Sequence, residues 1–283
     1  MSLATIPDIA SQLIDARVRL GRPLVMGIVN ATPDSFFEGS RGETTATAIA
    51  LGERLASEGA DILDIGGEST RPGSESISDA EELARVIPVI EALVAKTNIP
   101  ISIDTSKPEV ASAAYNAGAT VLNDIAALRG GADMPRVAAR FPLVILMHML
   151  GESPRTMQKD PHYENVVSDI TVFLKERVAV LGADSKKVWI DPGIGFGKTV
   201  EHNLEILRGL EVFAKTAPVV VGASRKSFLG KILGTEEQPL PTEQRLAGSL
   251  AVACRAAQAD AMCVRVHDVK ETVSALEIWR RSL

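Results

Sequence analysis

Short apolar runs alternate with longer amphipathic segments along the chain from about residue 24 onward. Each run ends in a polar or Gly-rich loop, and an amphipathic segment follows. Continuous apolar runs of this length are typical of strands buried on both faces in a parallel sheet. The predicted strands are Leu24–Asn30, Asp61–Gly66, Pro100–Asp104, Thr120–Asp124, Leu143–Met149, Val188–Asp191, Pro218–Gly222 and Met262–Val266.

The amphipathic segments between these runs predict helices, and several carry start or stop signals. Ser78 can cap the helix that follows it, and Pro108 occupies a first turn, where its missing N–H costs little. Gly59, Gly118 and Gly182 mark helix ends. The predicted helices are Glu43–Glu58, Asp79–Thr97, Pro108–Ala117, Met134–Phe141, Tyr163–Leu181, Glu201–Leu210, Thr242–Ala257 and Asp268–Arg281.

Eight strands alternating with eight helices predict a single α/β domain, a (β/α)₈ TIM barrel over residues 24–283. Residues 1–23 are interpreted as a short N-terminal extension that covers the bottom of the barrel. The alternative is an open doubly wound sheet. A dinucleotide-binding sheet of that kind would carry G-x-G-x-x-G after its first strand, and this chain has none there.

Composition narrows the functional class. The chain has 283 residues, of which 46% are hydrophobic, and a net charge of -6 argues against a general nucleic-acid surface. No apolar run approaches the length of a membrane span, and Met1 to Ile9 lack the basic region of a signal peptide. Cys254 and Cys263 are not spaced as a metal or redox pair, so we expect both to be buried and reduced. These features predict a cytoplasmic protein.

Polar side chains stand at the ends of nearly all the predicted strands. In a (β/α)₈ barrel these ends and the following loops form the active site. Taken singly, Asp268 or Ser106 is better explained as a helix cap, and His148 as a supporting residue. Taken together, so many polar groups converging on one space are costly unless a polar ligand meets them. The convergent residues are Asn30, Asp104, Asn123, Asp191, Lys226 and Arg265.

The types of side chain suggest a ligand with two parts. Asp104, Asn123 and Asp191 offer acceptors and an amide, which suit a flat heterocycle with adjacent N–H donors. Lys226 can donate to a ring carbonyl, and the planar guanidinium of Arg265 can stack on a ring. A second group could bind a phosphate chain, with the Asn30 amide oxygen as a ligand for Mg²⁺. Its members are Asn30, Arg71, Arg265 and His267.

At this point a family resemblance becomes clear, because eight motifs follow one another in order from residue 24 to near the C-terminus. The chain resembles the dihydropteroate synthases. The motifs that carry the resemblance are Met26-Gly27-Ile28-Val29-Asn30-Ala31-Thr32-Pro33-Asp34-Ser35-Phe36, Asp64-Ile65-Gly66-Gly67-Glu68-Ser69-Thr70-Arg71-Pro72-Gly73, Ser102-Ile103-Asp104-Thr105-Ser106-Lys107, Asn123-Asp124, Leu146-Met147-His148-Met149, Asp191-Pro192-Gly193-Ile194-Gly195-Phe196-Gly197-Lys198, Ser224-Arg225-Lys226-Ser227 and Arg265-Val266-His267-Asp268-Val269.

The resemblance implies condensation of 6-hydroxymethyl-7,8-dihydropterin diphosphate with p-aminobenzoate in folate biosynthesis, giving 7,8-dihydropteroate and diphosphate. The residues that match the pterin site are Asp104, Asn123, Asp191, Lys226 and Arg265. Those that match the diphosphate site are Asn30, Thr70, Arg71, Arg265 and His267, with Mg²⁺ at Asn30. Those that match the p-aminobenzoate site, the sulfonamide target of the family, are Phe36, Thr70, Pro72, Phe196, Lys226 and Ser227.

The chemistry required of such a site agrees with the residues present. An arylamine is nucleophilic at neutral pH, so the difficult step is departure of diphosphate, which cationic groups and Mg²⁺ can assist. We therefore predict a dissociative, SN1-like substitution, with Asp104, Arg71, Lys226 and Arg265 as the catalytic groups. Asp104 would help an electron-deficient pterin cation to form.

Two rival functions and one departure from the family pattern accompany this prediction. A pterin-dependent methyltransferase would not need the Ser-Thr-Arg-Pro-Gly and Ser-Arg-Lys-Ser loops. A non-catalytic pterin binder would be expected to lose Arg71, His267 or Lys226. Phe37-Glu38-Gly39-Ser40 replaces the usual polar residue and Asp-Gly-Gly, which bears on closure of that loop. The resemblance also implies a homodimer, which could form through the helices predicted over 242–257 and 268–281.

Overall fold

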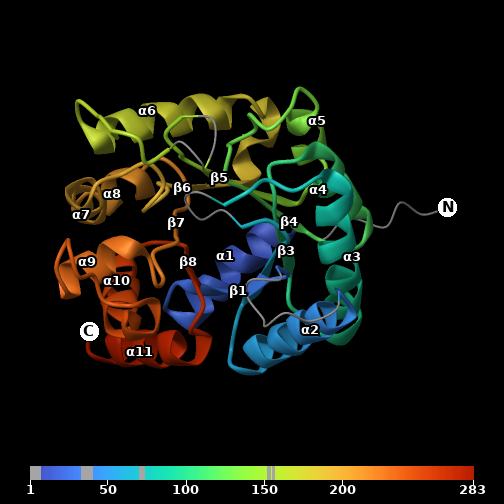
Figure 1. The fold of residues 1–283 in the computed structure, drawn as a ribbon, viewed down its shortest axis with the longest axis horizontal. Coiled ribbons are helices and arrows are strands. Elements are labelled where there is room, and N and C mark those ends of the chain that lie inside the picture. The colour runs from blue at the N-terminus through green and yellow to red at the C-terminus, as the bar shows by residue number, and fades with distance from the viewer. Residues whose placement is uncertain (1–7, 33–40, 70–73, 152–153, 155–156) are drawn as a thin grey trace.

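The structure is a computed structural model that describes residues 8–32, 41–69, 74–151, 154 and 157–283. Within it, parallel strands stand side by side at the centre and helices surround them (Figure 1). The strands are β1 (Leu24–Asn30), β2 (Ile62–Gly66), β3 (Ile101–Asp104), β4 (Val121–Asp124), β5 (Leu143–Met147), β6 (Val188–Asp191), β7 (Val220–Val221) and β8 (Cys263–Val266).

The strand order shows that the sheet curls round on itself. Neighbours run β6-β5-β4-β3-β2-β1-β8-β7, so the first strand pairs with both the second and the last. The two remaining edges meet where Ile190 bridges Val219 and the Ile190 amide donates to the Pro218 carbonyl at 2.9 Å. This arrangement confirms the (β/α)₈ barrel and excludes the open doubly wound sheet.

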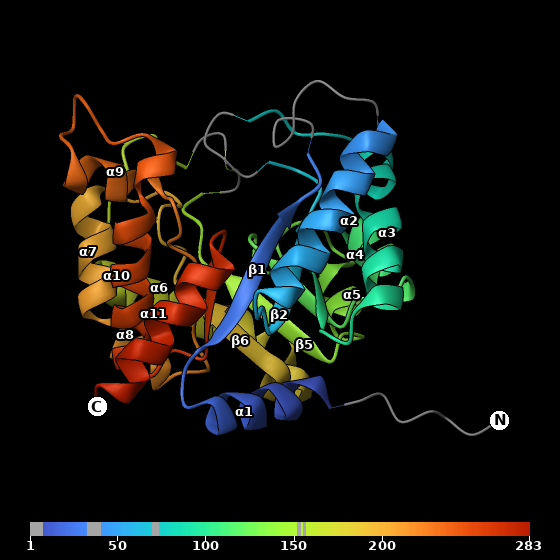
Figure 2. The ribbon, with the colours of Figure 1, turned by 90° about the horizontal axis from the view of Figure 1, so that it is seen from below.

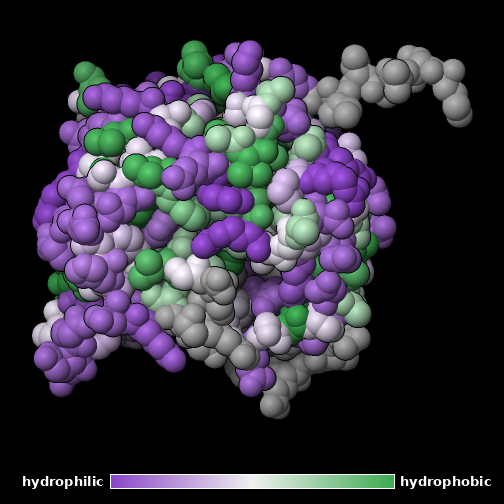
Figure 3. All heavy atoms as spheres, turned by 90° about the horizontal axis from the view of Figure 1, so that it is seen from above, coloured by the Kyte–Doolittle hydropathy of each residue, from purple (hydrophilic) through white to green (hydrophobic). Residues whose placement is uncertain are grey.

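The helices lie outside the strands and cover them from water. They are α1 (Ile9–Leu20), α2 (Arg41–Ser57), α3 (Asp79–Lys96), α4 (Pro108–Asn116), α5 (Met134–Ala138), α6 (Val166–Ala179), α7 (Val200–Arg208), α8 (Leu210–Ala214), α9 (Ser227–Leu233), α10 (Leu246–Gln258) and α11 (Val269–Arg281), with 3₁₀ turns at Gly182–Lys187 and Thr242–Gln244. On the face that carries α6, hydrophilic residues dominate the surface (Figure 3). In the described residues, no helix has the length and apolar character that would let it cross a membrane.

The inside of the barrel is apolar at one end and polar at the other. Helix α1 lies across the starts of the strands (Figure 2), where Ile9 and Leu13 join one buried cluster with Leu24, Ile62 and other residues of the strand beginnings. Helix α1, in the described part of the extension, therefore covers the bottom of the barrel, as predicted. With the bottom filled by hydrocarbon, the polar chemistry is confined to the opposite, carboxyl-terminal ends of the strands.

Several local predictions were wrong. The side chains of Ser106 and Asp268 do not cap the helices that follow them. Lys107, not Ser106, occupies the position before α4, and Asp268 pairs through both carboxylate oxygens with Arg225. The helix predicted from Thr242 begins properly only at Leu246, after a 3₁₀ turn. Cys263 is buried in β8 as expected, whereas Cys254 is only half-buried, and both are free thiols.

Candidate active site

Arg265, on β8, holds together two carboxylates from neighbouring strands. Its Nε donates to Asp64 Oδ2 at 2.6 Å, and its Nη2 donates to Asp104 Oδ2 at 2.7 Å. The Asn123 amide also donates to Asp64 Oδ2, at 3.0 Å. The structure thus brings the predicted residues Asp104, Asn123 and Arg265 to one place, and adds Asp64, which sequence reasoning did not assign to the site.

Asp64 is completely buried in the middle of β2. The available signal was a single carboxylate inside the apolar run Ile62–Gly66, since a buried charge is costly unless it has a partner. It lies two residues before Gly66, so both positions face the same side of the strand. Asp64 therefore holds two site residues in place from below.

Asp104 retains an acceptor atom that protein groups leave open. Among the described residues nothing hydrogen-bonds to its Oδ1, although that atom is buried. Burial raises the pKa of Asp104 to about 7, against the opposing pull of the Arg265 charge. A buried acceptor without a partner is expected to be met by a ligand or by water. Asp104 is thus suited to receive an N–H group.

Asp191 and Lys226 form the other side of the mouth of the barrel, the space at the carboxyl-terminal ends of the strands. The Gly193 amide donates to Asp191 Oδ1 at 2.7 Å, and burial raises the pKa of this carboxyl. Burial lowers the pKa of Lys226 to about 8, while the nearby Asp191 charge opposes that effect. Lys226 Nζ donates to the Ile194 carbonyl and lies 4.4 Å from the centre of the Phe196 ring. Lys226 therefore lies between the Asp191 carboxylate and the Phe196 ring.

Two glycines keep the centre of the mouth open. A Cβ on Gly66 would lie 3.8 Å from Asn30 Oδ1 and 3.8 Å from Asp104 Oδ2. A Cβ on Gly222 would lie 3.4 Å from Asp191 Oδ2 and 3.8 Å from the Arg265 Cβ. The absence of these side chains leaves room for a flat ligand between the polar groups.

The remaining predicted residues fall partly outside the described chain. The ring and amide nitrogens of His267 lie 3.1 and 3.2 Å from the Ser224 hydroxyl, and Ser227 is exposed at the start of α9. Phe36, Thr70, Arg71 and Pro72, and the departure at residues 37–40, lie outside the described residues. Their assignments stay predictions.

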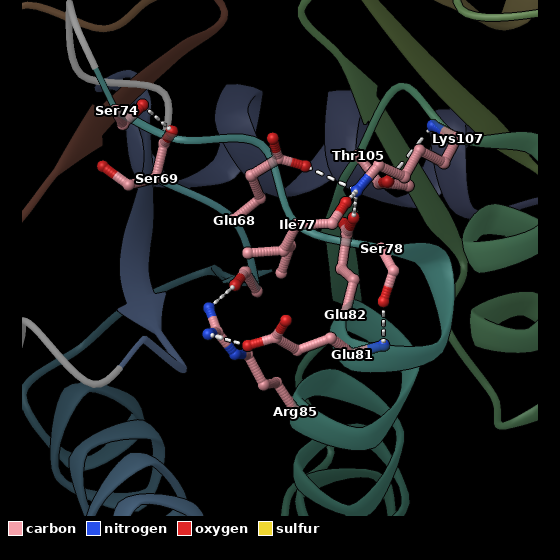
Figure 4. A network of polar contacts seen from close by, with 11 residues as sticks. Glu68, Ser69, Ser74, Ile77, Ser78, Glu81, Glu82, Arg85, Thr105 and Lys107 are labelled. Carbon is pink, nitrogen blue, oxygen red and sulfur yellow. Dashed lines mark hydrogen bonds and ion pairs between the residues drawn. The ribbon is translucent and has the colours of Figure 1, made fainter.

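The loop after β2 is fastened at both of its described ends. Lys107 Nζ contacts Glu68 Oε2 at 2.6 Å, Glu82 Oε2 at 2.7 Å and the Ile77 carbonyl at 2.8 Å (Figure 4). On the opposite side, Arg85 donates to the Gly67 carbonyl at 2.8 Å. Sequence reasoning missed this network, whose signal was the charged residues Glu68 and Lys107 in two neighbouring motifs, with Glu82 in the helix predicted between them.

The oxygen ligands of this site can bind Mg²⁺ only together with the phosphate oxygens of a substrate. In the described part of the chain, His, Cys, Asp and Glu form no group able to hold a metal ion. Mg²⁺ however keeps most of its waters and binds to proteins through one or two oxygens together with substrate phosphates. The Asn30 amide oxygen, at the edge of the mouth beside Gly66, fits that limited role.

Comparison with known proteins places this geometry in a family. The family model described as "Pterin binding enzyme" matches residues 26–267. The dihydropteroate synthase of Escherichia coli K12 is 42% identical over 268 residues, covering 93% of each chain. The Xanthomonas albilineans dihydropteroate synthase with 4-aminobenzoic acid superposes with a TM-score of 0.83 at 48% identity, covering 93% of this chain and 94% of that one.

A further solved structure is the Yersinia pestis dihydropteroate synthase in a sulfonamide drug complex. It has a TM-score of 0.85 and 42% identity, and the match covers 93% of this chain and 95% of that one. The ordered motifs, the closed barrel and the polar mouth agree with these matches along nearly the whole length. The chain therefore belongs to the pterin-binding enzymes and, within them, to the dihydropteroate synthase family.

Proposed function

We propose that the chain condenses 6-hydroxymethyl-7,8-dihydropterin diphosphate with p-aminobenzoate, releasing 7,8-dihydropteroate and diphosphate. The observation that carries this proposal is the Arg265 clamp on Asp64 and Asp104, which leaves Asp104 Oδ1 buried and open. A 2-amino-4-oxo-pyrimidine edge offers the adjacent N–H donors that such carboxylates accept. The clamp, Asn123 and Asp191 would bind the pterin ring, and Lys226 would donate to its carbonyl oxygen.

The reaction would follow a dissociative course. The bond between the pterin methylene and the diphosphate oxygen breaks first, and its electron pair leaves with diphosphate. The amine of p-aminobenzoate then uses its lone pair to form the C–N bond and loses a proton. Asp104 and Asp191 lie close enough to the ring site to favour the cationic intermediate, since their charge is worth most where water is excluded.

The leaving group would be bound by Asn30, Thr70, Arg71 and His267, as the family pattern implies, with Arg265 bordering the same space. Mg²⁺, when bound, would offset charge that accumulates on the departing diphosphate. Asn30 would hold it through its amide oxygen. His267 would act as a donor from a position set by its two contacts with Ser224.

The second substrate, p-aminobenzoate, would lie against the Phe196 ring. Phe196 is half-buried beside Lys226, and Ser227 is exposed at the adjoining helix start, so both can border an arylamine. Phe36, Thr70 and Pro72 would complete this pocket. The same surface would accept a sulfonamide, because a sulfonamide drug is bound by the similar Yersinia pestis enzyme.

Diphosphate release measured with both substrates, with either substrate alone and with Mg²⁺ removed tests the reaction. The expected result is release that needs both substrates and yields dihydropteroate. A pterin-binding protein without activity would bind the pterin and release nothing, which would refute the proposal.

The order of bond breaking is tested with pterin diphosphate that carries ¹⁸O at the oxygen joining the pterin methylene to the diphosphate. A dissociative step scrambles the label into non-bridging positions without net turnover when a non-nucleophilic p-aminobenzoate analogue replaces the amine. Label that stays in the bridge would contradict the dissociative course. Assembly as a cytoplasmic homodimer remains part of the proposal, and sedimentation of the purified protein would test the oligomeric state.

A further inference from the structure

Lys198 is a buried lysine that the reaction does not use. Its side chain is 5% exposed, and within the described part of the chain it forms no ion pair. Burial lowers its pKa well below the ordinary value, and the charge of Lys226 acts in the same direction. The Asp191 charge opposes this effect, and the described contacts of the amine are hydrogen bonds, so Lys198 serves here as a hydrogen-bond donor.

Lys198 contacts the backbone of Phe196, whose ring borders the mouth. Its Nζ donates to the Phe196 carbonyl at 2.9 Å and lies 2.9 Å from Nδ1 of His148. Burial lowers the pKa of His148 to about 2, so this ring is neutral. The ring packs edge-on against Phe173, with 4.9 Å between the ring centres. Lys198 thus ties the Phe196 backbone to a fixed, uncharged support.

His148 also links this support to the opposite side of the mouth, because its backbone amide donates to the Asp191 carbonyl at 2.9 Å. The loop that carries Phe196 is held by contacts with side chains outside it. Asn203 accepts from the Gly195 amide, and Tyr163 donates to the Gly197 carbonyl, but within the described residues it is Lys198 whose side chain donates to the Phe196 carbonyl. Gly193, Gly195 and Gly197 all have positive φ, which glycine adopts readily, and as glycines they have no side chains that could pack to fix the loop. External donors therefore determine where the Phe196 ring lies.

We propose that Lys198, supported by His148, is a positioning residue that places the Phe196 ring for the arylamine substrate and does not contribute to pterin binding. This inference rests on the proposed function, because it assigns Phe196 to the second substrate. Lys198 contacts neither the Arg265 clamp nor the Asp191 carboxylate through any hydrogen bond of the described residues. Its effect should accordingly appear in the KM for p-aminobenzoate and not in the binding of the pterin.

The test compares Lys198→Met, which keeps the aliphatic stem but removes the donor, with Lys187→Met as the matched control. Lys187 also donates to a backbone carbonyl, that of Ala139 at 2.6 Å, but at the start of β6, far from the mouth. We expect Lys198→Met to raise the KM for p-aminobenzoate about tenfold, the worth of one hydrogen bond. The dissociation constant of the pterin diphosphate should stay within about twofold, and Lys187→Met should change neither value.

A double-mutant cycle with Phe196→Ala separates positioning from general destabilisation. If Lys198 acts through the Phe196 ring, Lys198→Met should have almost no further effect on that KM once the ring is removed. Multiplicative effects, or equal losses for both substrates, would overturn the proposal. Lys198→Gln, which keeps a donor, should recover part of the KM and serves as the second variant if the methionine variant folds poorly.

The same series distinguishes this inference from the proposed function. Wild-type protein that makes no dihydropteroate would refute the function. The positioning role would then be judged by crystal structures of wild type and Lys198→Met, where an unmoved Phe196 ring would refute it.

Discussion

Replacing Asp64 by Asn should damage the pterin site while leaving the second substrate almost unaffected. The substitution keeps the shape of the side chain but removes the charge that accepts from Arg265 Nε at 2.6 Å and from the Asn123 amide at 3.0 Å. Asp64 is completely buried, so water does not reach this position to replace the lost interaction. A buried hydrogen bond to a charged group contributes about 1.5–3 kcal/mol.

That energy corresponds to a fall in kcat/KM for the pterin diphosphate of about 10- to 150-fold, at about 1.4 kcal/mol per factor of ten. The assay is steady-state release of diphosphate with each substrate varied in turn, together with thermal unfolding. The KM for p-aminobenzoate should change by less than about twofold, because no contact of Asp64 reaches Phe196 or Lys226.

Asp61→Asn is the control. Asp61 makes the same kinds of contact at the other end of the strands, accepting from Arg22 and from the Val25 amide, both at 2.8 Å. It should lower the melting temperature without changing kcat/KM. If Asp64→Asn unfolds at a lower temperature but retains wild-type kcat/KM for the pterin, then Arg265 is not held for catalysis and the reasoning about the clamp is wrong.

Three further results are expected. Pterin binding, measured by titration calorimetry, should be tightest between pH 7 and 8. Below about pH 7 Asp104 gains a proton and loses acceptor strength, and above about pH 8 Lys226 loses its positive charge and becomes a weaker donor. Affinity that rises steadily to pH 10 would contradict this. Lys107→Met leaves Glu82 buried without its cation, and burial already raises the pKa of Glu82. The free energy of unfolding in urea should therefore fall by about 3–5 kcal/mol near pH 8 and by less near pH 5, where Glu82 can be protonated. Adding Glu82→Gln should restore most of the lost stability. Asn30→Ala should raise several-fold the Mg²⁺ concentration needed for half-maximal diphosphate release, while pterin binding without Mg²⁺ stays unchanged. An unaltered Mg²⁺ requirement would show that Asn30 does not bind the cation.

The strands could be predicted because burial on both faces leaves a continuous apolar run, and β1 and β6 have the predicted bounds. The other strands are shorter than predicted: β2, β3, β4 and β8 each begin one residue later, β5 ends two residues earlier, and β7 keeps only Val220–Val221 of Pro218–Gly222. Helices α1 and α9 were not predicted as helices. The first was interpreted only as a cover, and the second follows a motif that had been interpreted as a binding loop.

The candidate site was predictable only in part, for a different reason. Asp104 and Asp191 end their strands and Asn123 lies one residue before the end of β4, where barrel geometry alone puts them at the mouth. Asp64 lies within a strand, and a sequence does not say which partner compensates a buried charge. The fit of Arg265 between two carboxylates depends on the pairing of β8 with β1, which in turn pairs with β2, and the sequence alone does not show this pairing of the first strand with the last.

That pairing has a consequence for how the protein is made. Strand β1 is the first strand to leave the ribosome, and its Leu24–Gly27 edge finds its partner only when Cys263–Val266 has been synthesised. Until then a long nascent chain carries an open parallel edge, which can pair with other chains. Chains that stop short of β8 should therefore aggregate during expression more than chains that include it.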